Sequence, residues 1–174
     1  MLERTWDETK PKVLFIMLNP STADHKQDDP TIRRCIGFAK ELGFGSLIIA
    51  NLFAYRATYP SDLVKAEDPI GRRNLEFLRK AQRHSDRVIT AWGLSQVVKK
   101  LNPEKILSTI YQWESYSLGY CQDGTPRHPL YLKKDTDLIK NKQGATKDYL
   151  KITSLPKPLL KPLSPPVERC LKPF

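Results

Sequence analysis

The chain has 174 residues and a mass of 20.0 kDa, a size that suits one domain. Hydrophobic residues make up 40% and charged residues 28%, an ordinary globular balance, and no apolar run reaches the roughly 18–20 residues of a membrane span. The three cysteines lie far apart, which excludes a zinc or iron–sulfur site built on Cys-x-x-Cys pairs. The first residues lack the apolar stretch of a signal peptide, so we expect a cytoplasmic protein that makes no contact with membranes.

The net charge of +10 is unevenly distributed along the chain. Residues 1–132 carry a net charge of +4, and residues 133–174 carry +6. Such a balance is compatible with nucleic-acid binding, but lysines that only keep a tail in solution would give the same count. Six of the 14 prolines lie in residues 156–173, where they disfavour helices and internal strands. We therefore predict a single α/β domain over residues 1–138 and a basic, proline-rich, poorly ordered C-terminal extension over residues 139–174.

The first predicted elements form a strand–helix–strand unit. Residues 13–18 are an uninterrupted apolar run, typical of a strand buried on both faces. Asp29-Pro30 is a helix-start signal, and apolar residues then recur at helical spacing as far as Leu42. A second buried strand is predicted over residues 46–51. Two strands joined by one crossover helix make a parallel pair.

The rest of the domain continues this alternation. We predict a helix that opens at Asp68-Pro69 and runs to about His84, and then a third strand over residues 87–91. Helical segments over residues 94–101 and 103–112 and a fourth strand over residues 117–121 follow. The expected fold is a three-layer α/β/α arrangement around a mainly parallel, four-stranded sheet.

The residues that directly follow the predicted strands are the candidates for a binding site, because open parallel sheets bind ligands beyond the carboxyl ends of their strands. They are Asn19-Pro20-Ser21, Asn51-Leu52-Phe53, Trp92-Gly93 and the segment 124–131. Polar side chains next to aromatic rings suit a flat polar ligand. The alternative is that the asparagines only hold loops by hydrogen bonds and that the aromatic rings are buried for packing.

Several long segments of the chain resemble a family known as domain of unknown function 1643, which contains uncharacterised bacterial and phage proteins. The segments are 18–24, 28–35, 51–58, 68–71 with Asn74, 91–93 and 124–131. The resemblance covers about residues 10–135, and it implies no established activity.

The order of these motifs is also similar to that of the uracil-DNA glycosylase superfamily. The sequence Met-Leu-Asn-Pro-Ser over residues 17–21 stands where the mismatch-specific branch has Gly-Ile-Asn-Pro-Gly. Residues 51–58 resemble the segment after the second strand of that branch, and 91–93 resemble a later strand that ends in glycine. Residues 128–130 correspond to the His-Pro-Ser-Pro loop of the uracil-specific branch. Ser21 and Leu130 depart from these patterns, in place of Gly and Ser.

This second resemblance implies a uracil-DNA-glycosylase-like fold and specific roles for residues of this chain. Asn19 would position the attacking water, and His128 would donate to the developing charge on the leaving base. Asn51, or the backbone near it, would contact an edge of the base, and Phe53 would stack on the flipped base. The remaining substrate-binding candidates are Ser21, Arg56, Trp92 and Arg127, with Arg56 placed to bind phosphate. His128 bracing its own turn and Arg56 in a structural salt bridge are the alternatives.

A second group of polar residues consists of Asp24, His25, Asp28 and Asp29. Carboxylates and an imidazole this close together are able to bind a divalent ion, but Asp28 and Asp29 are better explained as helix caps. We therefore predict no metal site and no cofactor. Arg33 and Arg34 near the helix start are either phosphate ligands or solvated helix residues.

The function expected from these observations is that of a hydrolase cleaving an N-glycosidic bond, or a binding protein, directed at a nucleobase in nucleic acid. One alternative is an enzyme of the same fold that processes free nucleosides or nucleotides. Another is a non-catalytic interaction module of a phage or its host, with a protein partner that the sequence does not identify.

Overall fold

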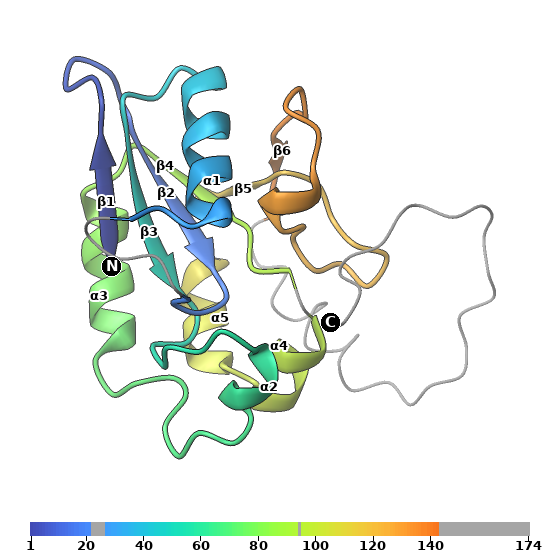
Figure 1. Ribbon diagram of the computed structural model, residues 1–174. Coiled ribbons are helices and arrows are strands. Elements are labelled where there is room, and N and C mark those ends of the chain that lie inside the picture. Colours follow the sequence, from blue (N-terminus) through green and yellow to red (C-terminus); the bar gives the residue numbers. More distant parts are fainter. Residues whose placement is uncertain (22–26, 94, 143–174) are drawn as a thin grey trace.

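A computed structural model describes residues 1–21, 27–93 and 95–142 of the protein. Its centre is a six-stranded sheet in the order β1-β3-β2-β4-β5-β6 (Figure 1). The strands are β1 (Leu2–Thr5), β2 (Lys12–Met17), β3 (Ser46–Asn51), β4 (Arg87–Thr90), β5 (Tyr116–Ser117) and β6 (Ile139–Lys140). The four central strands are parallel, and β1 and β6 are antiparallel edge strands.

The α/β class is confirmed, but the prediction of a mainly parallel four-stranded sheet is wrong, because the sheet is mixed and has six strands. Both missed strands lie at edges. In β1, half-buried and exposed residues alternate, and the strand carries the charged residues Glu3 and Arg4, so it has no continuous apolar run. β6 is only two residues long, and both are exposed. Edge strands with polar or exposed residues give little hydrophobic signal.

Helices cover both faces of the sheet (Figure 1). On one face, α1 (Pro30–Glu41) packs against alternate residues of β2, such as Phe15 and Met17. The other face carries α3 (Asn74–Arg83), α4 (Ser95–Leu101) and α5 (Glu104–Ile110). The short helix α2 (Pro60–Leu63) follows β3, and the 3-10 helix η1 (Pro129–Tyr131) packs on α1. These layers bury both sides of β2, as its apolar run predicts.

The start of α1 is as predicted. The carboxylate of Asp29 accepts a hydrogen bond of 2.8 Å from the backbone N–H of Ile32, and Pro30 is the first helical residue. Both features satisfy the requirements of a helix N-terminus, which leaves N–H groups unpaired. Gly43, with φ of +82°, follows the helix in a left-handed conformation that favours glycine.

The start of α3 differs from the prediction, since the helix begins at Asn74 rather than near Asp68. Asp68 accepts a hydrogen bond from Gly71 N–H at 2.8 Å, so it closes a turn instead of capping the helix. Gly71 has φ of +82°, which interrupts a right-handed helix. The Asn74 amide then donates to the backbone carbonyls of Asn51 and Leu52 and ties the start of α3 to the end of β3.

The sheet extends past residue 138, the predicted end of the domain. β6 pairs with β5, and Asn141 is 7% exposed and donates its backbone N–H to Ser115. The domain therefore includes at least residues 139–141. Residues 143–174, most of the predicted C-terminal extension, lie outside the described residues, so that part of the prediction is untested.

Candidate functional site

The chain segments that follow β2 and β3 stay paired beyond the ends of the two strands. The backbone N–H groups of Leu52 and Phe53 donate to the carbonyls of Met17 and Leu18, each at 2.9 Å. Ala57 N–H donates to the carbonyl of Pro20 at 3.0 Å. The two segments that carry most of the sequence motifs therefore lie against each other at the carboxyl edge of the sheet.

The side chain of Asn19 joins these two segments. Its amide nitrogen donates to the carbonyl of Ala57 at 2.7 Å and to the carbonyl of Pro20 at 2.9 Å. An asparagine amide has two N–H donors, so both are used and the orientation of the side chain is fixed. The group of Asn19 that remains for a ligand or a water is the acceptor Oδ1.

Three further candidates contribute to the same edge. Arg56 donates through Nη1 to the backbone carbonyl of Ser21 at 2.7 Å, a second tie between the segments. Asn51 is the half-buried last residue of β3, and its carbonyl accepts from Asn74. Through this contact Arg56 helps to hold the segment after β3 against the segment after β2.

Two of the aromatic candidates are buried. Phe53 is 0% exposed and Trp92 is 1% exposed, and both belong to the core cluster under α3, α4 and α5. Trp92 meets Tyr111 edge-on, with ring centroids 6.4 Å apart. Rings enclosed in this way have no free face for a base, so the stacking predicted for Phe53 is not available in this conformation.

His128 lies beside the end of β4. Gly93 donates its N–H to the carbonyl of Pro126 at 3.0 Å, and a Cβ atom at Gly93 would lie 3.0 Å from the Cβ of His128. Gly93 also has φ of +65°, so a side chain there would be strained as well as crowded. A glycine is therefore required for the last loop to approach β4 this closely.

The chemical state of His128 follows from its surroundings. Burial lowers the pKa of His128 from 6.5 to about 4 by desolvating the imidazolium, and the nearby negative charge of Asp29 opposes only part of this shift. The imidazole is therefore neutral at physiological pH. Its Nδ1 accepts a hydrogen bond of 3.3 Å from Leu130 N–H, which leaves the proton on Nε2. His128 thus presents Nε2–H as a hydrogen-bond donor.

The loop that carries His128 is fastened to α1 by Arg34. The guanidinium donates to the backbone carbonyls of Pro129 and Leu132 and lies over the ring of Phe38, 4.7 Å from its centroid. Arg34 is therefore a structural residue, and neither of the two readings from the sequence, phosphate ligand or solvated residue, describes it. Arg127, the half-buried neighbour of His128, donates its backbone N–H to the carbonyl of Gly119.

The structure brings Asn19, Asn51 and His128 to one edge of the sheet. β2 is the neighbour of both β3 and β4, with Met17 paired to Asn51 and Ile16 to Thr90. Asn19 and Gly93, which contacts His128, follow the ends of these neighbouring strands. The carboxyl edge therefore combines a fixed acceptor at Asn19 with a neutral donor at His128.

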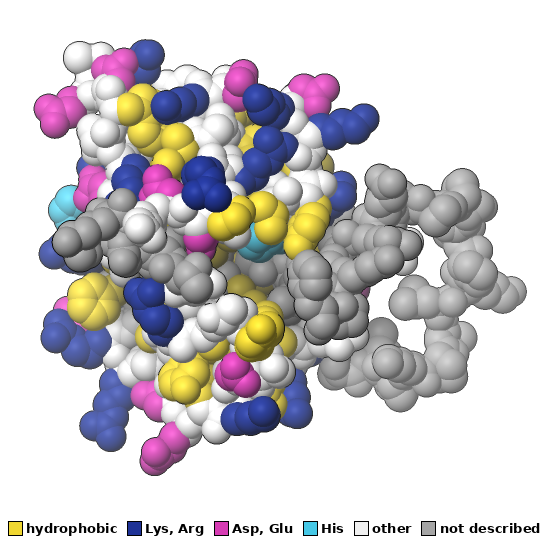
Figure 2. All heavy atoms as spheres, viewed as in Figure 1, with side chains coloured by type: hydrophobic (Ala, Val, Ile, Leu, Met, Phe, Trp, Pro, Cys, Tyr) yellow, Lys and Arg dark blue, Asp and Glu magenta, His cyan; other side chains and the backbone are white. Residues whose placement is uncertain are grey.

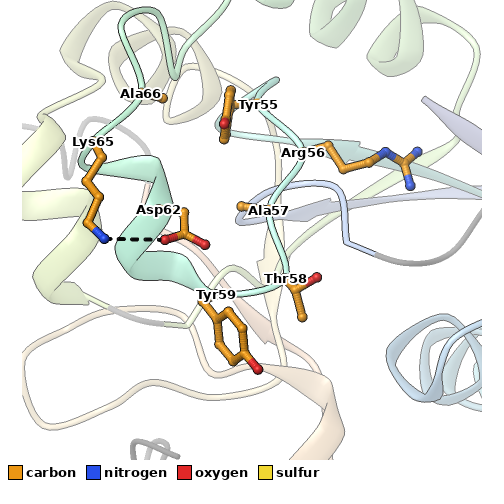
Figure 3. Close-up of a pocket in the computed structure, with 8 residues that line it drawn as sticks. All are labelled: Tyr55, Arg56, Ala57, Thr58, Tyr59, Asp62, Lys65 and Ala66. Carbon is orange, nitrogen blue, oxygen red and sulfur yellow. Dashed lines mark ion pairs between the residues drawn. The ribbon is translucent and has the colours of Figure 1, made fainter.

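An open pocket of about 520 Å³ is formed by the loop between β3 and α2, by α2 and by the residues just after α2. It is lined by Tyr55, Arg56, Ala57, Thr58, Tyr59, Asp62, Lys65 and Ala66. Figure 3 shows the two tyrosines on opposite sides of Ala57 and Asp62, with Arg56 pointing away. Only Arg56 of this set was a candidate from the sequence. The signal that could have found the pocket is the pair of tyrosines four residues apart beside a cation, in a loop that follows a strand.

The metal-binding alternative gains no support. Over residues 1–21, 27–93 and 95–142 there is no group of three or more His, Cys, Asp or Glu side chains that could hold an ion. Asp28 instead pairs with Arg4 at 2.8 Å, and Asp29 caps α1. Asp24 and His25 lie outside the described residues.

Among the helices of residues 1–21, 27–93 and 95–142, none has both the length and the apolar composition of a membrane span.

Comparison with known proteins places the chain in a family but assigns it no activity. No curated protein and no solved structure gave a match to this sequence. A family model described as a protein of unknown function (DUF1643) matches residues 1–130, about three quarters of the chain. The chain therefore belongs to the DUF1643 family.

Proposed function

We propose that this protein acts on a nucleobase in nucleic acid as a hydrolase that cleaves the N-glycosidic bond, with a fold like that of the uracil-DNA glycosylases. The observation that carries the proposal is that His128, packed against Gly93 after β4, lies on the same sheet edge as Asn19, with Nδ1 occupied by Leu130 N–H. A donor and an acceptor at one edge match the two demands of the reaction, which are to stabilise the leaving base and to hold the water.

The role of His128 follows from the charge that develops in the reaction. When the bond between C1′ of the sugar and the base nitrogen breaks, the electron pair leaves with the base, which becomes anionic. A preorganised N–H aimed at this charge stabilises the transition state more than the ground state. With a pKa lowered to about 4, the His128 side chain supplies this hydrogen bond as a neutral imidazole rather than as an acid.

The role of Asn19 is narrowed by its hydrogen bonds. Because both amide N–H groups are held by the carbonyls of Pro20 and Ala57, the water would donate to Oδ1. A water that donates a hydrogen bond keeps its lone pair free to attack the sugar carbon, and the proton that this water loses balances the one that the anionic base takes up on release. The same two bonds also tie loops together, so a purely structural role is the alternative for Asn19.

Tyr131 is better placed than Phe53 to stack on a base. Its side chain is 50% exposed, and its ring lies 6.3 Å from that of His128, centroid to centroid, at an angle of 45°. Figure 2 shows hydrophobic side chains gathered near η1, beside the N-terminal end of α1. We therefore assign the stacking role to Tyr131, with Asn51 and Arg127 on the same edge to contact the base and the backbone.

The test is a screen of oligonucleotides that carry uracil, mismatched bases or damaged bases, read out as abasic-site formation. We expect the protein to release at least one of these bases and His128→Gln to be slower by about 100-fold or more. The matched control is His84→Gln, which changes an exposed histidine at the end of α3. If no substrate is cleaved, or if His128→Gln is as active as the unmodified protein, the proposal is wrong.

Free nucleosides or nucleotides are a second candidate substrate class, favoured by the size of the open pocket. A volume of about 520 Å³ lies in the usual range for small-molecule sites. Salt separates the two cases, since binding of a nucleic-acid strand weakens steeply as salt rises. We expect free nucleotides to bind with little salt dependence if they are the substrate.

A further inference from the structure

We infer that the pocket between Tyr55 and Lys65 binds one unpaired nucleotide of a single strand, next to the nucleotide that reaches His128. The choice of nucleic acid as the ligand rests on the proposed function, whereas the choice of a single strand rests on the pocket itself. This site is distinct from the His128 edge, because it is built on the loop between β3 and α2.

The loop that forms the pocket is held in one shape before any ligand arrives. Tyr55 N–H donates to the carbonyl of Pro69 at 3.2 Å, and Ala57 is fixed on both sides by Pro20 and Asn19. Asp62 N–H donates to the carbonyl of Tyr59 at 3.0 Å, where α2 begins. A preorganised loop loses little conformational freedom when it binds.

The exposed side chains of the pocket suit a nucleotide. Tyr55 is 45% exposed and Tyr59 is 64% exposed, so both rings offer faces on which a base can stack. Lys65 is 78% exposed and pairs with Asp62 only at 3.8 Å, so its ammonium can turn to a phosphate. The Asp62 carboxylate is an acceptor for the amino groups of a base.

The position of the pocket links it to the His128 edge. Ala57 lines the pocket, and its carbonyl is the acceptor that holds the Asn19 amide. A strand that follows this loop would therefore pass from the tyrosines to the carboxyl edge of the sheet. Because Ala57 belongs to the pocket and also contacts Asn19, we place the bound nucleotide next to the nucleotide whose base is released.

Single strands are favoured over duplexes by the exposed tyrosine rings. Stacking on Tyr55 or Tyr59 needs a base whose face is not already covered by its neighbours. In a duplex the adjacent base pairs cover both faces of each base, so an intact duplex offers no free base face to these rings.

The experiment measures the binding of a fluorescent 12-nucleotide single strand by anisotropy, with the full chain and at several salt concentrations. We expect Tyr55→Ala together with Tyr59→Ala to weaken binding about 10-fold or more, because base stacking on aromatic side chains contributes strongly to such complexes. Tyr55→Phe with Tyr59→Phe keeps the rings and should retain the affinity. Lys65→Ala should lower the slope of log affinity against log salt by about 0.7, the loss of one phosphate contact.

Phe77→Ala and Lys105→Ala are matched controls, because both residues are exposed and neither lines the pocket. Neither change should alter binding by more than about twofold. The midpoint of urea unfolding for each variant shows whether the fold is kept. The Tyr→Phe variants keep the rings and remove only the hydroxyl groups.

The proposal is overturned if the double Ala variant binds the strand as tightly as the unmodified protein. It is also overturned if a blunt duplex of the same length binds as tightly as the single strand, or if a mononucleotide displaces the strand at equal concentration. Failure of the proposed function is seen separately. If the strand binds through the tyrosines but no abasic site forms, the hydrolase function is wrong and the binding role of the pocket stands. If bases are released but the double Ala variant binds the strand unchanged, the binding role of the pocket is wrong and the hydrolase function stands.

Discussion

The two halves of the sheet are held together by different forces. β2 and β3 are buried by apolar side chains on both faces, with residues such as Phe15, Leu14 and Ile48 at 0% or 1% exposure. At the other end, β4, β5 and β6 meet around the amide of Asn141. Its Nδ2 donates to Thr90 at 3.0 Å and to Ser115 at 2.8 Å, and its Oδ1 accepts from Ser117 at 2.6 Å and from Tyr120.

The difference determines how each half responds to change. The free energy gained from apolar burial is proportional to the buried area and does not depend on direction. Replacing a residue by a smaller apolar one therefore removes only part of that free energy. A buried polar network depends on direction, and the loss of one member leaves the others without partners. Four variants test this comparison, two in the framework and two at the edge where both halves meet the candidate site.

The largest effect is expected at the apolar end. Phe15→Ala should lower the free energy of unfolding by about 4 kcal/mol, because it removes a fully buried ring and leaves a cavity between β2 and α1. Urea unfolding measures the loss. Phe77→Ala makes the same chemical change at a residue that is 45% exposed and should cost less than about 1 kcal/mol. Equal losses in both variants would contradict the apolar account.

At the polar end, Asn141→Leu should lower the free energy of unfolding by about 3 kcal/mol, because the buried hydroxyls of Thr90, Ser115 and Ser117 each lose their hydrogen bond to Asn141. Combining Asn141→Leu with Ser115→Ala should recover part of this loss, since the buried Ser115 hydroxyl that bonds to Asn141 is then removed as well. Urea unfolding of the single and double variants checks both statements. An Asn141→Leu variant as stable as the unmodified protein would contradict the stabilising role of this polar network.

The third prediction concerns the pH dependence that His128 introduces. Because the pKa of His128 is about 4 in the folded state against 6.5 for an unperturbed group, the unfolded state takes up a proton first as the pH falls. The stabilisation is thus complete above pH 6.5 and is lost between pH 6.5 and 4. We expect a loss of about 2 kcal/mol over this window, at 1.4 kcal/mol per pKa unit and with the partial exposure of the ring allowed for. Unfolding curves of His128→Gln over the same range should lack this component, and parallel curves for the two proteins would contradict the assignment.

The smallest change in stability is expected for Asn19→Ala. Loss of its bonds to Pro20 and Ala57 should cost about 1 kcal/mol, because both partners are part-buried carbonyls that water can reach in the variant. If Oδ1 holds the attacking water, base release should slow far more than binding weakens, since that interaction is made in the transition state. A denaturation curve and an activity assay on one preparation separate the roles. Reduced stability with unchanged base release would make Asn19 purely structural.

The central fold could be predicted because its signals are local. The runs over residues 13–18 and 46–51 became β2 and β3, and Asp29-Pro30 starts α1 as predicted. The same signal at Asp68-Pro69 failed, because the positive φ of Gly71 turns the chain before α3 can start. β1 and β6 are held by pairing with distant strands, and such pairing leaves no periodic pattern in a short segment.

The sequence predicted where the candidate residues lie in the fold, but it did not predict which of their side chains are exposed. Sequence order and strand polarity were enough to place Asn19, Asn51 and His128 at one edge. The sequence left stacking and core packing open for Phe53 and Trp92, because their burial depends on helices that cover them from elsewhere in the chain. The state of His128 likewise depends on a loop that closes over it, and the tyrosines of the pocket became evident only from their exposure.

The antiparallel edge strand β1 also bears on whether two copies of the protein could pair edge to edge. β3, with the apolar stretch Leu47–Ile49, would present an open row of backbone hydrogen-bonding groups if β1 did not cover it. β1 carries Arg4, paired with Asp28, and Glu3, paired with Lys12, so the outermost strand of the sheet is short and charged. Such strands are poor templates for a second copy. Removal of the first six residues would therefore expose the apolar edge of β3. We expect such a variant to aggregate, in addition to losing stability.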